Sequence, residues 1–204
     1  MILILDYDMG NIASIRNMFH SIGYDDVLLS GNRNDIEKSD KIILPGVGSF
    51  DKGMENLKER GLKDVLIEAA MVRKKPILGI CLGMQLLGLD SEEGQKNGLG
   101  LIPFHTKRFA LNEQYKVPHM GWADVTVENE ECPLVKYVDK EASRYYFVHS
   151  YHAVCDDDRN VLMSSEYGYR FTAAVYRGNI FGVQFHPEKS HNYGKALLKG
   201  FVEL

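Results

Sequence analysis

The sequence predicts an α/β fold: a doubly wound, mostly parallel central sheet with flanking helices and an antiparallel β extension. In the first half of the chain, continuous apolar runs alternate with segments whose apolar residues recur every three or four positions. This alternation is typical of βαβ units and a parallel sheet. From Leu99 onward, short β-branched and aromatic stretches between polar turns indicate antiparallel strands. The 204 residues, 45% of them hydrophobic, suit a single domain over residues 1–204.

The first half of the chain contains four apolar stretches that predict strands, and the continuous run at Ile2–Leu5 is typical of a strand buried on both faces. They are Ile2–Leu5, Val27–Leu29, Lys41–Leu44 and Ile77–Ile80. Ile12, Ile15 and Phe19 predict a helix that ends before Gly23. Another helix is expected from about Leu62 to Arg73, and a further one begins directly after Cys81 and is expected to end at Ser91–Gly94. In such sheets ligand sites lie beyond the carboxyl ends of the strands, so functional residues are expected directly after these runs.

The second half of the chain is expected to form the antiparallel extension. Its strands are predicted at Val125–Val127, Tyr145–Val148, Phe171–Tyr176 and Ile180–Phe185. Arg177, Gly178 and Asn179 predict a hairpin turn between the last two strands. The segment from Tyr193 to Phe201 is expected to be a closing helix.

The composition argues against several classes of protein. A net charge of −4 gives no basic surface for nucleic acid. Three widely spaced cysteines make neither a disulfide framework nor a metal pattern, which indicates a reducing, cytoplasmic compartment. The amino terminus, MILILDYDMGN, lacks the features of a signal peptide, and no apolar run is long enough to cross a membrane.

The segment Pro76–Gln85, PILGICLGMQ, contains the candidate nucleophile. Gly79, Cys81 and Gly83 match the pattern Gly-x-nucleophile-x-Gly, in which a sharp strand-to-helix turn exposes the central residue. A thiol at the start of a helix is favoured as thiolate by unpaired N–H groups and the helix dipole. The alternative for Cys81 is a buried structural cysteine.

A thiol nucleophile needs a general base and a group that orients the base. Proline discourages helix, so in the extended chain His186 and Glu188 would project to the same side of Pro187, with Glu188 orienting His186. Cys81, His186 and Glu188 then form a candidate triad, whereas a surface turn is the alternative for His-Pro-Glu alone. Among the other histidines, His20 and His105 have no acid at a useful spacing, so we rank His186 first.

The loop Pro45–Phe50 follows the third predicted strand and contains Gly46 and Gly48. Its glycines would let a backbone N–H approach a developing oxyanion, and an ordinary strand-to-helix turn is the alternative. No His, Cys, Asp and Glu set suggests a metal, and no nucleotide-binding glycine loop is present. Acyl transfer without a cofactor is the chemistry that remains.

The chain resembles the class I (triad) glutamine amidotransferases over nearly its whole length, a family with a flavodoxin-like fold. Within the family, it resembles the glutaminase subunits of imidazole glycerol phosphate synthases. The motifs that carry the resemblance are LDYDMGNIASIRN at 5–17, ILPGVGSFDKGM at 43–54, LGICLGMQLL at 78–87, SEEG at 91–94, PHMGW at 118–122, YYFVHSYH at 145–152 and GVQFHPEKS at 182–190. The Cys and His-Pro-Glu motifs specify the class, and PHMGW, FVHSY and HPEKS together narrow it to this subunit.

The resemblance implies hydrolysis of L-glutamine to glutamate and ammonia without a cofactor. Cys81 would attack the side-chain amide, and His186 would protonate the departing ammonia. The backbone N–H groups of Leu82 and of the Val47-Gly48 segment would bind the oxyanion. The implied substrate contacts are Gly48, Gln85, Glu93, Ser150 and Tyr151, although Gln85, Glu93 and Tyr151 also have structural interpretations.

The resemblance also implies a (βα)₈-barrel cyclase as heterodimer partner, which uses the ammonia in histidine biosynthesis. In this family the glutaminase is nearly idle until the partner binds. Asn11, Trp122 and Lys189 would face the partner, although a sole tryptophan is more often part of the core.

The sequence departs from the family pattern at Asp8 and Ala123, where glycine and asparagine are usual, and after Ser190, where glycine is usual. These departures keep a second hypothesis open: a paralogue that supplies ammonia to a surface-polysaccharide sugar amidotransferase. Two hypotheses of other classes are a non-catalytic subunit that steadies a partner and a stand-alone cysteine hydrolase.

Overall fold

A computed structural model describes all 204 residues and contains a twelve-stranded mixed sheet. Five neighbouring strands form its parallel half. In spatial order they are β2 (Val27–Ser30), β1 (Ile2–Leu5), β3 (Lys41–Leu44), β4 (Ile77–Ile80) and β12 (Ile180–Val183). The first four strands were predicted from their apolar runs and are confirmed.

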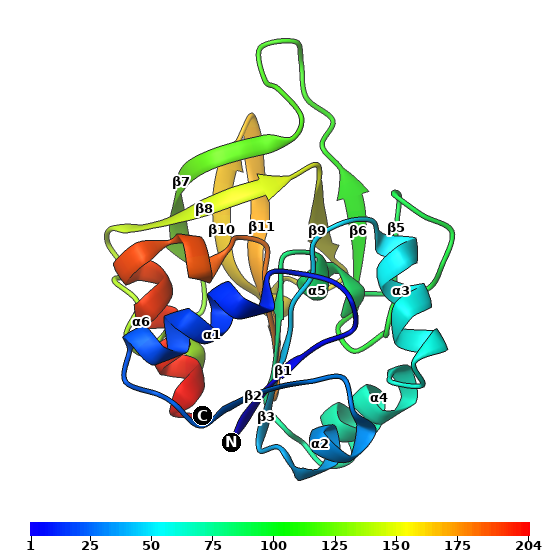
Figure 1. Ribbon diagram of the computed structural model, residues 1–204. Coiled ribbons are helices and arrows are strands. Elements are labelled where there is room, and N and C mark those ends of the chain that lie inside the picture. The colour runs from blue at the N-terminus through cyan, green and yellow to red at the C-terminus, as the bar shows by residue number, and fades with distance from the viewer.

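Helices cover both faces of the parallel half (Figure 1). One face carries α1 (Ile12–Ser21) and α6 (His191–Val202), and the other carries α2 (Arg33–Lys38), α3 (Phe50–Glu59) and α4 (Lys63–Met71). Alternate residues of β1 face the two layers: Ile2 and Ile4 belong to the same core as Phe19, and Leu3 to the core that contains Leu57. This alternation confirms the doubly wound arrangement. The sequence predicted α1, α4 and α6, but not α2 or α3.

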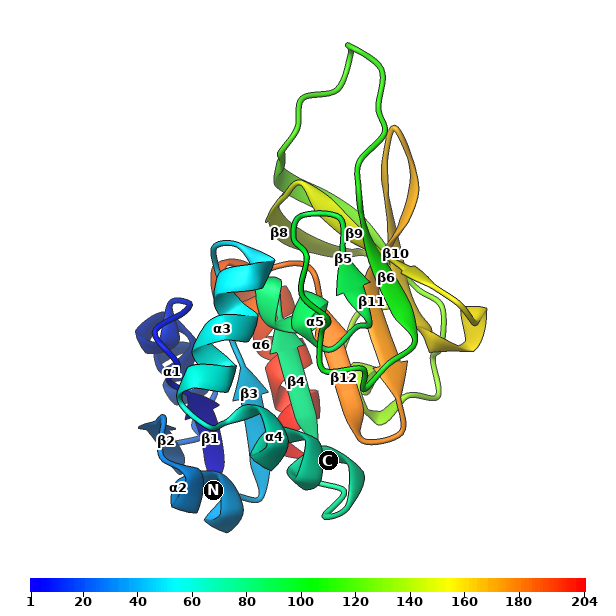
Figure 2. The ribbon, with the colours of Figure 1, turned by 90° about the vertical axis from the view of Figure 1, so that its right-hand side faces the viewer.

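Beyond β12 the sheet continues with four strands that pair antiparallel (Figure 2). They continue in the order β11 (Tyr169–Arg177), β10 (Val161–Tyr167), β7 (His119–Val127) and β8 (Ser143–His149). Three more strands, β5 (Asp90–Ser91), β6 (Phe104–Arg108) and β9 (Tyr151–Cys155), pair beside this path. Short 3₁₀ turns occur at Pro133–Val135, Asp158–Asn160 and Pro187–Lys189. The antiparallel extension is confirmed, with more strands than were predicted.

Two sequence predictions about this region are wrong in detail. The segment Ile180–Phe185 was assigned to the antiparallel extension, but β12 ends at Val183 and runs parallel to β4. It is a central strand that is buried along its whole length, and the predicted hairpin turn at Gly178-Asn179 joins it to β11. The helix after Cys81 was expected to continue to Ser91, but α5 is only Leu82–Leu86. The chain then turns, and Asp90 already pairs with His105 of β6.

The carboxyl ends of β3, β4 and β12 lie next to one another, because these strands are parallel neighbours. Pro45 follows β3, Cys81 follows β4, and Gln184 follows β12. Three segments far apart in the sequence therefore meet at one edge of the sheet. None of the helices has the length and apolar character that a membrane span requires.

Candidate active site

Cys81 lies at the turn between β4 and α5, as the glycine pattern predicted. Its backbone has φ +55° and ψ −111°, a conformation that non-glycine residues rarely adopt. A Cβ on Gly83 would come within 1.8 Å of the carbonyl oxygen of Leu44, and a Cβ on Gly79 within 2.6 Å of that of Gly83. The turn therefore needs glycine on both sides of the cysteine, because backbone atoms occupy the space of a side chain.

Hydrogen bonds from neighbouring strands bring His186 to the same edge of the sheet. The N–H of Cys81 donates to the carbonyl of Val183 at 2.8 Å, and the N–H of His186 donates to that of Tyr146 at 2.9 Å. The hydroxyl of the buried Ser190 donates to the carbonyl of His186 at 2.6 Å and accepts the N–H of Tyr146 at 3.0 Å. The sequence did not predict a role for Ser190, whose hydroxyl links the backbone of His186 to that of Tyr146.

His186 and Glu188 form a buried pair. Nδ1 of His186 lies 2.8 Å from Oε1 of Glu188, and the two side chains are 2% and 3% exposed. Since a carboxylate only accepts hydrogen bonds, Nδ1 carries a proton and Nε2 remains for chemistry. The pairing was predicted from an extended chain, but Pro187–Lys189 is a 3₁₀ turn. A turn also brings residues two apart together, so the pair forms by a different local geometry.

The pKa of His186 is raised to about 9. Burial by itself lowers this pKa, but the nearby Cys81 and Glu188 raise it by more. His186 is therefore protonated at neutral pH. Its Nε2 has no hydrogen-bond partner of ordinary geometry, and it can supply a proton to a leaving amine.

The other histidines lie elsewhere or lack an orienting acid. His20 and His105 were thought to have no nearby carboxylate, which is wrong: His20 pairs with Asp25, and His105 lies 2.8 Å from Asp90. Both pairs are more than one third exposed and line no cavity with Cys81. Position beside the thiol therefore distinguishes His186, not its possession of a carboxylate partner.

Cys81 and His186 line one cavity of about 280 Å³. The other lining residues are Val47, Gly48, Leu82, Gln85, Glu93, Pro118, Val148, His149, Ser150 and Tyr151. All of the residues expected to bind substrate or an oxyanion are in this set. The cavity thus brings together a thiol, a protonated imidazole, and polar groups from segments that are far apart in the sequence.

Comparison with known proteins identifies the family. The family model described as "Glutamine amidotransferase class-I" matches residues 3–204. The chain belongs to the class I glutamine amidotransferases. Two relatives, from Pseudomonas aeruginosa and Methanococcus maripaludis, are each named "Imidazole glycerol phosphate synthase subunit HisH 2". They are 52% and 50% identical to this amidotransferase, over all of this chain and 100% and 99% of their own lengths.

Solved structures support the fold of this amidotransferase. The crystal structure of a glutamine amidotransferase matches with a TM-score of 0.73 and 18% identity, over 99% of this chain and 97% of its own. The glutaminase domain of the Trypanosoma brucei CTPS matches with a TM-score of 0.68 and 16% identity, over 99% and 93%. These likenesses confirm the α/β fold with its mixed sheet.

The oxyanion segment of this amidotransferase has one donor already engaged. The N–H of Leu82 donates to the carbonyl of Gly46 at 3.3 Å. Gly48 has φ +114°, which a glycine adopts without strain. In this structure the Leu82 N–H, one of the expected oxyanion donors, is thus occupied by the carbonyl of Gly46.

The expected substrate contacts come from three places around the thiol. Glu93 accepts the backbone N–H of Phe50 at 2.8 Å, at the start of α3, through its Oε2. Ser150 and Tyr151 lie at the junction of β8 and β9, where Nδ1 of His149 donates to the carbonyl of Tyr151 at 2.7 Å. Gln85 lies one turn after Cys81 on α5 and is buried. These placements are compatible with amino-acid binding, and they also give Glu93 a structural contact.

Gln184 is a second residue that sequence reasoning missed. Its side chain is fully buried between Gln85 and Cys81, with hydrogen bonds to both. The one signal in the sequence was a polar residue inside the apolar run GVQF. The contacts of Gln184 make it part of the environment of the thiol.

The residues expected to face a partner lie on the surface. Trp122 is 39% exposed, so it is not a core residue. Its ring stacks on that of His191 at 5.5 Å, and Lys189 lies 5.7 Å from the ring of Tyr146, which also contacts Trp122. Asn11 caps α1 by accepting the N–H of Ser14.

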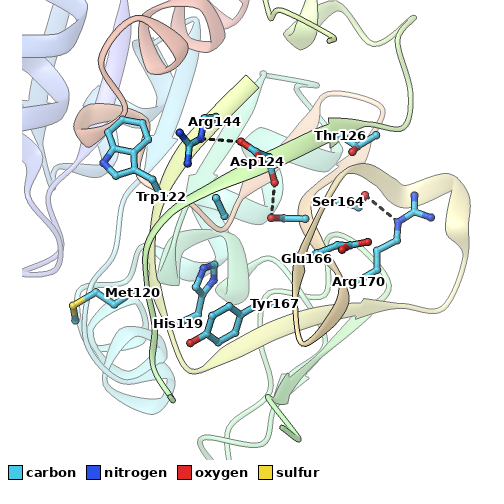
Figure 3. Close-up of a pocket in the computed structure, with 12 residues that line it drawn as sticks. His119, Met120, Trp122, Asp124, Thr126, Arg144, Ser164, Glu166, Tyr167 and Arg170 are labelled. Carbon is cyan, nitrogen blue, oxygen red and sulfur yellow. Dashed lines mark hydrogen bonds and ion pairs between the residues drawn. The ribbon is translucent and has the colours of Figure 1, made fainter. Parts of the chain in front are cut away.

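A larger hollow of about 750 Å³ lies beside Trp122 and contains neither Cys81 nor His186 (Figure 3). Figure 3 shows Asp124 and Arg144 paired in it, with Arg170 close to Ser164. Its acidic and basic side chains are interspersed, so it has no charge of one sign. No group of three or more His, Cys, Asp or Glu residues is arranged to hold a metal ion.

His149, which lines the cavity, forms a buried, uncharged pair with His119. Nδ1 of His119 lies 3.1 Å from Nε2 of His149, which acts as acceptor because its own Nδ1 donates to Tyr151. Burial lowers the pKa of His119 to about 4 and that of His149 to about 3. Both values lie below the ordinary 6.5, so the pair stays neutral in the folded protein at neutral pH.

This pair predicts a loss of stability in acid. Below pH 6.5 the unfolded chain protonates both histidines while the folded protein does not. The free energy of unfolding therefore decreases as the pH falls from 6.5 toward 4, by about 1 to 2 kcal/mol for each histidine at about pH 5. In urea titrations, His119→Phe should keep the stacking on Phe147 and Tyr167 and reduce this acid loss.

His20→Asn is the control for this prediction, because His20 is exposed and should leave the acid loss unchanged. An acid loss of the same size in His119→Phe and in the wild type would contradict the account. His186 acts at the other end of the pH range. Its raised pKa stabilises the fold fully below 6.5, and this contribution is lost as the pH rises through about 9.

Proposed function

We propose that this chain is the glutaminase subunit of an imidazole glycerol phosphate synthase, and that it hydrolyses L-glutamine to glutamate and ammonia. One observation carries the proposal: Cys81 and His186 share a cavity with all of the expected oxyanion and substrate residues. The relatives named HisH, at 52% and 50% identity over the whole chain, support the assignment to this synthase. We treat residues 1–204 as one domain that acts in the cytoplasm, which its three unpaired cysteines support.

The first half of the proposed reaction is acylation. The Cys81 thiolate attacks the carbon of the glutamine side-chain amide, and a C–S bond forms. The negative oxygen is held by N–H groups of Leu82 and of the Val47-Gly48 segment once Leu82 has released Gly46. Protonated His186 gives its Nε2 proton to the amide nitrogen, the C–N bond breaks, and ammonia leaves. Glu188 holds the imidazole in the correct orientation throughout, from 2.8 Å.

The second half of the reaction is hydrolysis of the thioester. His186, now neutral, takes a proton from water as the water oxygen attacks the glutamyl carbon. The C–S bond breaks, the Cys81 thiolate returns, and glutamate leaves after losing its carboxyl proton. Cys81 and His186 of the cavity, the backbone N–H groups beside them and Glu188 behind the imidazole are the protein groups that these two halves use.

We propose that the ammonia passes to a (βα)₈-barrel partner across the face that contains Asn11, Trp122 and Lys189. Trp122 and Lys189 both pack against Tyr146, whose backbone bonds to His186 and Ser190. The proposed partner face is thus joined to the general base by a short covalent and hydrogen-bonded path. A partner that moved Tyr146 would therefore also move the backbone of His186.

A second candidate is a paralogue that supplies ammonia to a surface-polysaccharide sugar amidotransferase. The departures from the family pattern favour it, because they lie near the proposed partner face. Asp8 has φ +65° and pairs with Arg60 at 3.1 Å, and His191 has φ +47° and stacks on Trp122. A non-catalytic subunit is less well supported, since the triad and its cavity are intact.

The test is to purify the chain with a barrel cyclase subunit from the same organism and to measure glutamate formation alone and in the complex. We expect the barrel cyclase to raise glutamine turnover by about 5- to 150-fold, and the complex to make imidazole glycerol phosphate from its aminoimidazole substrate. Turnover stimulated only by a sugar-modifying partner would favour the paralogue. A complex that uses free ammonia but never glutamine would contradict the glutaminase assignment.

A further inference from the structure

Gln184 is a fully buried amide placed directly beside the proposed nucleophile. It follows Val183 at the end of β12, next to the end of β4 (Figure 2). Its Nε2 donates to Sγ of Cys81 at 3.8 Å, and its Oε1 accepts from Nε2 of Gln85 at 3.1 Å. Its backbone N–H donates to the carbonyl of Ala173 in β11 at 2.9 Å, so a hydrogen bond to the neighbouring strand holds the backbone that carries the side chain.

The two glutamine amides form a directed chain of hydrogen bonds that ends on sulfur. Each amide has one donor end and one acceptor end, so both must point the same way along the chain. In the observed direction the sulfur receives a hydrogen, which suits a thiolate. In the reversed direction Gln184 would present oxygen to the sulfur, which suits a neutral thiol.

Few other groups can stabilise a negative sulfur at this place. The buried hydroxyl of Tyr7 is close enough for a charge on Cys81 to affect it, but it donates to the carbonyl of Pro45. The sulfur is the hydrogen-bond acceptor for Nε2 of Gln184, and a buried N–H without an acceptor is unfavourable. Gln184 and His186 are therefore the side chains that can donate to the sulfur.

The other end of the chain reaches the substrate cavity. Gln85 lines the cavity and uses its Nε2 on Gln184. This leaves the Oε1 of Gln85 as a hydrogen-bond acceptor that can face a bound amino acid. The orientation of Gln85 therefore depends on the orientation of Gln184.

We propose that Gln184 has two tasks in the proposed glutaminase reaction, on which this inference rests. Its amide N–H holds the Cys81 thiolate, and its amide oxygen orients Gln85 so that the free oxygen of Gln85 meets the substrate. The first task affects the nucleophile before glutamine binds. The second affects glutamine binding. The two tasks are separable, because they use different atoms of Gln184.

The thiolate task is tested without turnover, by alkylation of Cys81 with iodoacetamide over a range of pH. In Gln184→Met, which keeps the size of the side chain and removes both polar atoms, the pH midpoint of alkylation should rise by about 1 to 2 units. In Gln184→Glu, which keeps an acceptor for Gln85 but adds negative charge beside the sulfur, it should rise at least as far. In Gln114→Met, at an exposed loop residue, it should stay at the wild-type value.

The orienting task is tested by glutamine kinetics of the complex with the barrel subunit. Gln85→Met should raise KM with a smaller effect on kcat. Gln184→Met should raise KM and also lower kcat, with about a 10- to 100-fold loss in kcat/KM. Gln114→Met is the control for a new methionine, because Gln114 is exposed and lies in a loop, and it should change neither constant.

Thermal unfolding of each variant separates these effects from loss of fold. A folded Gln184→Met protein with the wild-type alkylation midpoint would overturn the thiolate task. Unchanged KM in both Gln184→Met and Gln85→Met would overturn the orienting task. If the wild-type complex never turns over glutamine while the alkylation midpoint still depends on Gln184, the proposed function fails and the contact with sulfur stands.

Discussion

Replacing Cys81 with alanine should reduce glutamine hydrolysis by the partner complex by on the order of 10⁴-fold or more. The sulfur of Cys81 forms the C–S bond of the proposed thioester, and the cavity contains no other thiol that could replace it. Binding of glutamine should be largely kept, since the substrate contacts remain. Steady-state glutamate formation and glutamine binding by calorimetry, measured on the same preparation, check both parts.

Cys155→Ala is the matched control, because Cys155 is a half-buried cysteine on β9 outside the cavity. It should keep near wild-type turnover. The complex of the Cys81→Ala variant should still use free ammonia, because the proposed barrel partner would carry out that step. Glutamine turnover within tenfold of the wild type in Cys81→Ala would contradict the assignment of the nucleophile, and loss of ammonia-dependent activity would instead indicate a damaged complex.

Replacing Glu188 with glutamine should lower kcat by about 10²- to 10⁴-fold. The carboxylate accepts the Nδ1 proton of His186 and raises the pKa of that imidazole. An amide in its place can present N–H instead of oxygen to Nδ1, which favours the wrong tautomer and removes the negative charge. The measurement is the pH dependence of kcat for the complex, on both its acid and its alkaline side. It should show a lower kcat together with a lower pKa for His186.

Glu203→Gln is the control for this change. Glu203 is a surface carboxylate that pairs with Lys136 at 2.7 Å and does not line the cavity. Its replacement should leave kcat and the pH profile unchanged. A Glu188→Gln variant with a wild-type profile would show that His186 does not depend on Glu188.

The fold could be predicted where a local pattern decides the structure. Ile2–Leu5 and Ile42–Leu44 are continuous apolar runs, and strands buried on both faces have this pattern. β12 was misassigned because its run is also compatible with a hairpin, and its pairing with β4 depends on residues far away in the sequence. α2 has one buried residue, Ile36, so no helical period was visible.

The site could be predicted in part for the same reason. Cys81 and the His186–Glu188 pair belong to short motifs whose neighbouring residues determine the local backbone geometry. Gln184 and Ser190 belong to no such motif. The role of a buried amide or hydroxyl depends on hydrogen-bond partners that are far away in the sequence. The bond from Leu82 to Gly46 depends on backbone dihedrals of the loop, which residue types alone do not specify.

Trapping the acyl-enzyme tests the central claim most directly. The wild-type complex is mixed with glutamine, quenched in acid during steady-state turnover, and digested for mass spectrometry. We expect one glutamyl group on the peptide that contains Cys81, lost on treatment with a thiol and missing from Cys81→Ala. Glutamate formation without an adduct on Cys81, or with the adduct on another residue, would contradict the account.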